Sequence, residues 1–327
     1  MSLVYWLIIR IYIKLHYIYD IANKLARKET ADKFKKPDMD ITDDTPLRAP
    51  EDITRYFGQY LASKNRAVEE ETDYLKDIIG DTGDVPYVFN KTEFDLLFDS
   101  AMKFMKNNKA TGPQSTPIEI YKYSQTARDK LREIIENIWI TETFPNHWAD
   151  GNTLMFYKKG DPNNGDNYRP LTMLNHEFKL FSRMLLLDIL EDIENYLSDH
   201  HNGFRQRRST RDNLLVLRWT IHRILKSKQD KVVLFIDFKG AFPSVAHNPI
   251  IDSLKDAGVK GKNIRLIRLI LLNARIRYKY DNLNHSDWVS VCRGIMQGDV
   301  VNTMLFVVMF NALENIGPYE AMRIMLS

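Results

Sequence analysis

Residues 232–238 form a short apolar run that a single aspartate, Asp237, interrupts near its C-terminal end. The run is too short for a typical helix and is rich in β-branched and aromatic residues, so it predicts a buried strand. A helix is expected to follow, with Asn248 as N-cap, Pro249 in the first turn and Gly258 beyond the end. A carboxylate that ends an apolar strand can hold Mg²⁺ or phosphate, although a turn or cap role is the simpler alternative.

Composition bounds the kind of protein. A chain of 327 residues with 44% apolar side chains is long enough for a sizeable core and for about two domains. Its single cysteine, Cys292, excludes an intrachain disulfide and a cysteine-rich zinc site. A reducing, intracellular compartment is therefore expected, without a choice between cytoplasm and nucleus.

Hydrophobic periodicity predicts helices over most of the chain. Short apolar runs predict strands at 153–157 and 232–238, and alternation predicts a hairpin formed by 275–280 and 288–292. Helices are expected at 51–62, 93–105, 124–141, 178–197, 210–225, 264–272 and 303–313.

The N-terminus is apolar but interrupted. Arg10, Lys14 and His16 break the apolar stretch at residues 4–21, so that its longest uncharged run is about nine residues, against roughly 20 that a bilayer span needs. An amphipathic or packed helix is the main prediction. A helix lying on a membrane surface and a true span remain the alternatives, and no stable membrane span is expected.

Charge is distributed unevenly along the chain. The near-neutral total of +3 hides an acidic block, residues 37–100, between basic blocks at 1–36 and 101–327. Within the last block, basic side chains gather near Lys158 and Arg169, at residues 203–231 and at residues 260–279. Such clusters suit a polyanion, because each neutralised phosphate releases counterions, whereas a solvated helix face is the plain alternative for any one of them.

Five motifs occur in a fixed order over residues 107–313. Together they resemble the reverse transcriptases of non-LTR (LINE-like) retrotransposons. The motifs are Lys109-Ala110-Thr111-Gly112-Pro113; Tyr157-Lys158-Lys159-Gly160-Asp161-Pro162 with Asn167-Tyr168-Arg169-Pro170-Leu171; Gly203-Phe204-Arg205 with Arg208-Ser209-Thr210; Phe235-Ile236-Asp237-Phe238-Lys239-Gly240-Ala241-Phe242; and Gly294-Ile295-Met296-Gln297-Gly298-Asp299.

The resemblance implies an α+β, right-hand polymerase fold with fingers and a partial palm, preceded by an N-terminal helical extension. It implies an RNA-directed DNA polymerase, a nucleotidyltransferase that extends a DNA primer on an RNA template with deoxynucleoside triphosphates. Asp237 is then the candidate catalytic residue and ligand of both Mg²⁺ ions, with the backbone carbonyl of Phe238 as a further ligand. Two such ions activate the primer hydroxyl and stabilise the leaving pyrophosphate.

The resemblance also assigns nucleotide-binding and RNA-binding residues. Phe242 matches the aromatic residue that stacks under the sugar and excludes a 2′-hydroxyl, with an ordinary core aromatic as the alternative. Lys159 (or Lys158) and Arg169 match residues that grip the triphosphate. Gln297 and Gly298 match the turn that packs on the nascent base pair. The residues expected to contact nucleic acid are Arg205, Arg207, Arg208 and Arg211.

The departures from the family pattern bear on activity. Pro243 stands where the family usually has aspartate, and Val300–Thr303 replaces the usual Pro-Leu-Ser-Pro. The family's aromatic-x-Asp-Asp motif, which carries the other metal carboxylates, does not occur in the sequence, where the only adjacent aspartates are Asp43 and Asp44. The sequence therefore predicts a truncated polymerase, with weakened Mg²⁺ binding and no activity alone. A non-catalytic RNA-binding remnant is the alternative.

Four segments are expected from these patterns. They are a basic and apolar N-terminal helix at 1–36, an acidic linker and helical segment at 37–100, reverse transcriptase fingers at 101–231 and a partial palm at 232–327.

Overall fold

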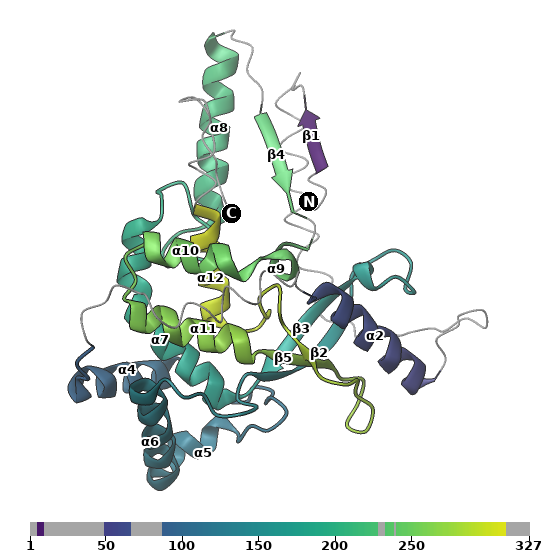
Figure 1. The fold of residues 1–327 in the computed structure, drawn as a ribbon. Helices are drawn as coiled ribbons and strands as arrows, with labels where there is room; N and C mark the ends of the chain where they lie inside the picture. Colours follow the sequence, from purple (N-terminus) through teal and green to yellow (C-terminus); the bar gives the residue numbers. More distant parts are fainter. Residues whose placement is uncertain (1–4, 10–48, 67–86, 228–232, 239, 312–327) are drawn as a thin grey trace.

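The computed structural model describes residues 5–9, 49–66, 87–227, 233–238 and 240–311. They form a helix-rich α+β fold with a small mixed sheet (Figure 1). The helices are α2 (Pro50–Lys64), α4 (Lys91–Phe104), α5 (Ile118–Tyr123), α6 (Gln125–Thr141), α7 (His176–Tyr196), α8 (Thr210–Ser227), α9 (Ala241–Ser244), α10 (His247–Asp256), α11 (Gly261–Asn273) and α12 (Val300–Asn311), with a 3₁₀ turn, η1, at Gly165–Asn167. The strands are β1 (Tyr5–Ile9), β2 (Asp150–Tyr157), β3 (Tyr168–Leu174), β4 (Val233–Asp237), β5 (Arg275–Tyr278) and β6 (Val289–Ser290).

A four-stranded sheet has the order β3-β2-β5-β6. β2 and β3 form an antiparallel hairpin, β5 joins the other edge of β2 in parallel, and β6 pairs antiparallel with β5. The expected hairpin over 275–280 and 288–292 is confirmed by the pairing of β5 with β6. Since β5 lies in the segment expected to be palm and β2 in the segment expected to be fingers, this sheet crosses the expected boundary at residue 231.

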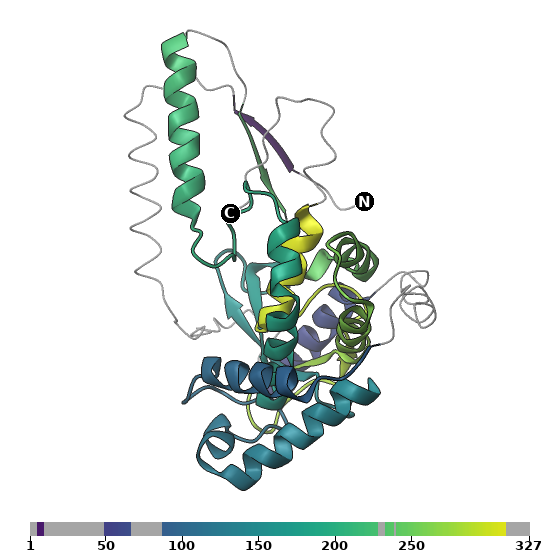
Figure 2. The same ribbon diagram turned by 90° about the vertical axis from the view of Figure 1, so that its left-hand side faces the viewer.

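α7 is the central helix of the core. It packs against α4, α11 and α12, and α10 packs on α12 (Figure 2). Phe178, Phe181, Leu185 and Ile189 of α7 are buried completely. Burial of such side chains contributes about 1.5–3 kcal/mol each relative to exposure, so α7 organises the helices that carry the site described below.

α2 lies on the sheet and ties the region before residue 67 to the body. The ring of Phe57 contacts Tyr168 of β3 and Tyr278 of β5, with centroids 4.9 Å apart in both pairs. The hydroxyl of Tyr56 donates to the carbonyl of Asn163 at 2.8 Å and accepts from the backbone N–H of Gly165. The helical part of the expected acidic linker is therefore docked on the sheet.

Several expectations about local structure need correction. Residues 5–9 form a strand, β1, antiparallel to β4, where a helix was expected, because an aromatic and β-branched run can satisfy its backbone on the edge of β4. The remainder of the expected helix at 1–36 lies outside the described residues. α10 begins at His247 with Ala246 as N-cap, so Asn248 is inside the helix. The short elements α5, α9 and β3 were not predicted.

The remaining expected helices are confirmed within a few residues of their predicted ends, and β4 confirms the strand at 232–238. Among the described helices, none combines the length and apolarity that a membrane crossing requires.

Candidate functional site

A turn at residues 294–298 joins two parts of the chain that are far apart in sequence. On one side, the backbone N–H of Thr172 in β3 donates to the carbonyl of Gln297 at 3.0 Å. Gly298 has a φ of +129°, and a Cβ added there would lie 2.4 Å from the carbonyl oxygen of Thr172. Only glycine permits this close approach without a shift of the backbone, so the turn is seated directly on β3.

On its other side, the turn is bonded to the segment around α9. The N–H of Ile295 donates to the carbonyl of Phe242 at 3.1 Å, and the N–H of Gly294 donates to that of Val245 at 2.7 Å. A Cβ at Gly294 would lie 2.8 Å from the backbone of Pro243. The backbone of Pro243, the residue that departs from the family pattern, therefore packs closely against the turn at Gly294.

The β2–β3 hairpin carries the three residues expected to grip a triphosphate. Lys158 and Lys159 follow the end of β2, and Arg169 lies on β3 opposite Phe156. The N–H of Lys158 donates to the carbonyl of Asn167 at 2.8 Å, which closes the hairpin. All three side chains are exposed. Partial burial, and next the repulsion from Arg169, lower the pKa of Lys158, which places these two positive charges near each other.

Phe242 is held by aromatic rings from two other elements. Its ring stacks on Phe306 of α12 at a centroid distance of 4.7 Å and an interplanar angle of 9°, and meets Phe204 edge-on at 6.4 Å. Phe238, four residues before it in sequence, contacts Phe310 of α12, with ring centroids 5.0 Å apart. α12 therefore supports the segment after β4 through two phenylalanines. Phe242 is half-buried, which is compatible with both its sugar-stacking and its core assignment.

Asp299 belongs to the same site but was not assigned a role from the sequence. It is buried directly after Gly298, and its Oδ2 accepts a hydrogen bond from the hydroxyl of Ser182 at 2.6 Å. Burial raises the pKa of Asp299, while the bond from Ser182 opposes the shift. Lys179 and Arg183 of α7 lie within electrostatic range of this carboxylate. Its position next to Gln297-Gly298 was the signal in the sequence that could have identified it.

Asp237 is the last residue of β4, and its backbone is in register with Tyr5 of β1. Within the described ranges, no group of three or more histidine, cysteine, aspartate or glutamate side chains could hold a metal ion.

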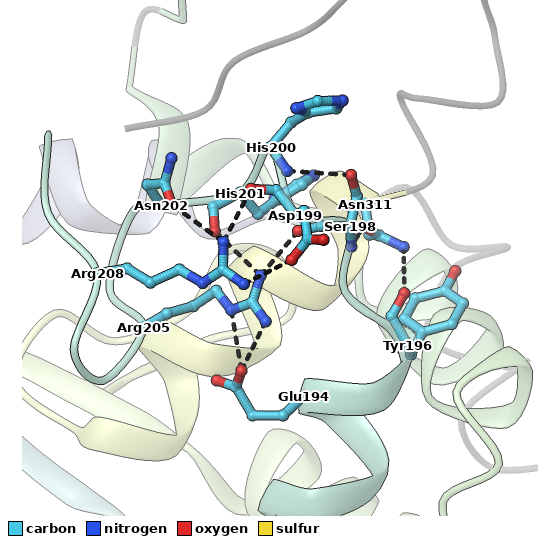
Figure 3. Close-up of polar contacts among 10 residues, drawn as sticks. All are labelled: Glu194, Tyr196, Ser198, Asp199, His200, His201, Asn202, Arg205, Arg208 and Asn311. Atoms are coloured by element: carbon cyan, nitrogen blue, oxygen red, sulfur yellow. Dashed lines mark hydrogen bonds and ion pairs between the residues drawn. The ribbon is translucent and has the colours of Figure 1, made fainter. Parts of the chain in front are cut away.

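The loop before α8 separates the expected RNA-binding arginines into two kinds, and Figure 3 shows the first kind, Arg205 and Arg208. Arg205 is a structural residue whose side chain is 4% exposed. Its guanidinium donates twice to Glu194 Oε2, at 2.6 and 3.0 Å, and also donates to the carbonyls of Ser198 and His201. Arg208 forms an ion pair with Asp199 at 2.7 Å and donates to its carbonyl. The expectation that Arg205 presents its charge to nucleic acid needs correction, because its guanidinium is buried and bonded to Glu194 and to two backbone carbonyls within the loop.

Arg207 and Arg211 are of the second kind. Both are exposed. Arg207 has a φ of +60°, in the left-handed region, so the backbone turns sharply between the two buried or paired arginines. Of the four arginines expected to contact nucleic acid, only Arg207 and Arg211 are exposed.

Comparisons with known proteins agree with these motifs. Residues 157–318 match the family model described as reverse transcriptase (RNA-dependent DNA polymerase). The chain is 31% identical over 185 residues to a probable RNA-directed DNA polymerase from transposon BS of Drosophila melanogaster, which covers 54% of this chain and 20% of that protein. It is 23% identical over 202 residues to the Pol polyprotein of the type-1 retrotransposable element R2 of Popillia japonica, covering 62% and 28%.

The RNA-directed DNA polymerase from the mobile element jockey of Drosophila melanogaster is 25% identical over 169 residues, covering 50% of this chain and 18% of that protein. The chain thus spans less than a third of the length of each of these relatives.

Proposed function

This chain belongs to the reverse transcriptase family of non-LTR retrotransposons, and on that premise we propose that it is a fingers and partial palm region of a right-hand polymerase that copies an RNA template into DNA. The observation that carries the proposal is the turn at 294–298. It is hydrogen-bonded to β3 through Thr172 and to the segment after β4 through Phe242 and Val245. Three motifs distant in sequence are thereby joined by backbone contacts.

Each motif has a role in this proposal. Lys159, with Lys158, and Arg169 bind the triphosphate of the incoming deoxynucleotide, since a point charge and a planar fork complement each other on phosphate oxygens. Gln297 and Gly298 contact the nascent base pair. Phe242 contacts the sugar, supported from behind by Phe306.

The metal chemistry is a separate part of the proposal. When Mg²⁺ ions are bound, they activate the primer hydroxyl and stabilise the pyrophosphate. Asp237 and the carbonyl of Phe238 are proposed as ligands, but one carboxylate does not complete the site. We therefore propose that residues 1–327 alone do not sustain DNA synthesis.

Primer extension tests the inactivity. The 327-residue chain, an RNA template, an annealed DNA primer, deoxynucleotides and Mg²⁺ are expected to give no extended product. Synthesis that is lost in Asp237→Ala would overturn the proposed inactivity.

Nucleotide binding tests the polymerase assignment independently of turnover. Photo-crosslinking of a deoxynucleoside triphosphate to the chain on a primer–template should be lost in the double variant K159Q/R169Q. Both residues are exposed, so folding should change by no more than about 0.5 kcal/mol. The matched control is K103Q/K106Q, which removes two exposed lysines elsewhere. Equal crosslinking in both double variants would refute the triphosphate assignment.

Non-catalytic RNA binding is the second candidate function. The exposure of Arg207 and Arg211 favours it, while Arg205 and Arg208 are engaged within the loop. It predicts salt-sensitive RNA affinity that falls on charge reversal at Arg207 and Arg211 and is indifferent to Asp237→Ala. RNA affinity that depends on Asp237 would contradict it.

A further inference from the structure

α8 is the most exposed long helix of the described chain. It projects away from the helices around α7 (Figures 1 and 2). Of its 18 residues, Asn213 alone is buried. Helices of globular proteins usually owe their stability to the packing of one face, so the surfaces of α8 call for an explanation.

The two sides of α8 differ in chemistry. Positions at helical spacing form an apolar stripe, and this stripe accounts for the amphipathic pattern of the helix. The opposite side carries two basic residues, a histidine and a large aromatic residue, together with two exposed aliphatic residues and one aspartate. The stripe comprises Leu214, Leu217, Ile221, Ile224 and Leu225, and the opposite side comprises Asp212, Leu215, Val216, Trp219, His222, Arg223 and Lys226, with Arg211 and Arg218 at the border between the two sides.

Trp219 is the unusual member of the basic side. Its ring is 65% exposed, and it lies away from the apolar stripe. His222 and Arg223 are three and four residues further on, so they are its neighbours on the helix surface. Burial of an indole ring against a partner is favourable, and the face of the ring can stack on a flat ring or on a cation.

We infer that this basic side of α8 binds the unpaired RNA template strand, with a base stacked on Trp219 and phosphates held by Arg223 and Lys226. The inference rests on the proposed function, since it assigns the template a surface beyond the loop of Arg207 and Arg211. Base–aromatic stacking combined with a basic surface is the common way in which proteins hold single strands.

Charge favours a nucleic acid over a protein partner. The helix holds four arginines and lysines, none of which forms a side-chain hydrogen bond or ion pair with another described residue. Its one acidic residue, Asp212, accepts from the backbone N–H of Ser209 at 2.8 Å and so caps the helix start. Arg207 and Arg211 continue the positive surface at that end, which gives a strand a path from the loop along the helix.

The test measures the affinity of the full chain for a labelled oligouridine RNA of about 16 nucleotides at several salt concentrations. Trp219→Ala should weaken binding by about tenfold or more, because one base stack is lost, and Trp219→Phe should retain most of the affinity. R223Q/K226Q should reduce the slope of log affinity against log salt by about 1.4, the value for two released phosphate contacts on a single strand.

Controls separate this surface from folding and from catalysis. K103Q/K106Q removes the same charge elsewhere and should leave affinity and slope close to those of the unmodified chain. The α8 variants should retain the unfolding free energy and the nucleotide crosslinking that K159Q/R169Q removes. The proposed polymerase role and the role of α8 can therefore fail independently.

Three results would overturn the inference. The first is RNA affinity that is unchanged in Trp219→Ala and in R223Q/K226Q. The second is tighter binding of a single-stranded DNA of matching length. The third is a change in oligomeric state in Trp219→Ala, seen by light scattering, without a change in RNA affinity, which would make this side of α8 a protein contact.

Discussion

Replacement of Gly298 by alanine tests whether the close contact with Thr172 fixes the position of the 294–298 turn on β3. The φ of +129° at Gly298 is one that L side chains rarely adopt, and the new methyl group would lie 2.4 Å from the carbonyl oxygen of Thr172. Backbone atoms cannot rotate away as the end of a long side chain can. Either the turn or β3 must move.

The cost has two parts. A non-glycine residue in a sparsely populated backbone conformation costs about 1–3 kcal/mol. Movement of the turn also weakens the 3.0 Å hydrogen bond from Thr172 to Gln297, which is worth about 1 kcal/mol net. The expected loss of unfolding free energy is about 2–4 kcal/mol.

Gly258 provides the matched control. Its φ is +75°, but a Cβ there meets nothing within 4 Å. Gly258→Ala should therefore cost only the left-handed backbone strain, about 1–2 kcal/mol. Urea unfolding followed by circular dichroism compares the two variants. Equal losses in both would refute the claim that contact with Thr172 constrains the turn.

Two further predictions concern buried cations. Arg205→Ala should lower the unfolding free energy by about 3 kcal/mol, because Glu194 loses its partner, whereas Arg207→Ala should stay within about 0.5 kcal/mol; similar losses in denaturant titrations would contradict the contrast. Lys262 lies 3.3 Å above the ring of Tyr87, and its Nζ has no hydrogen-bond partner among the described residues. Burial lowers the pKa of Lys262 to about 7. Between pH 7 and the ordinary lysine pKa the folded state therefore binds fewer protons than the unfolded state, so the free energy of unfolding rises with pH through that window. The advantage of Lys262→Met in unfolding free energy should thus be larger at pH 7 than at pH 9.5, and a gap that does not vary with pH would exclude this origin.

Local pattern predicted most elements because their causes are local. The apolar spacing of residues 178–197 predicts α7, and the apolar run at 232–238 predicts β4, since these patterns follow from helix and strand periodicity. Residues 5–9 were assigned wrongly because a short apolar run is compatible with either structure. The partner strand, β4, decides between them.

The candidate site was predictable as motifs but not as an arrangement. The resemblance of the ordered motifs to the reverse transcriptase family predicts that Arg169, Phe242 and Gln297 belong to one site. The sequence places Asp299 beside Gln297-Gly298 but does not show that it is buried, because that burial depends on contact with α7 through Ser182.

Arg205 and Arg207 show where the sequence stops being informative. They are the same residue type in one basic cluster, and their spacing gives no reason to separate them. The fold buries Arg205 against Glu194 and leaves Arg207 in solvent. Residue type and periodicity determined the helices and the strands, because those depend on neighbours along the chain, and the order of the five motifs pointed to the family by resemblance. Which charges face solvent, and which motifs touch, depends on contacts between residues far apart in sequence, and only the tertiary structure decided it.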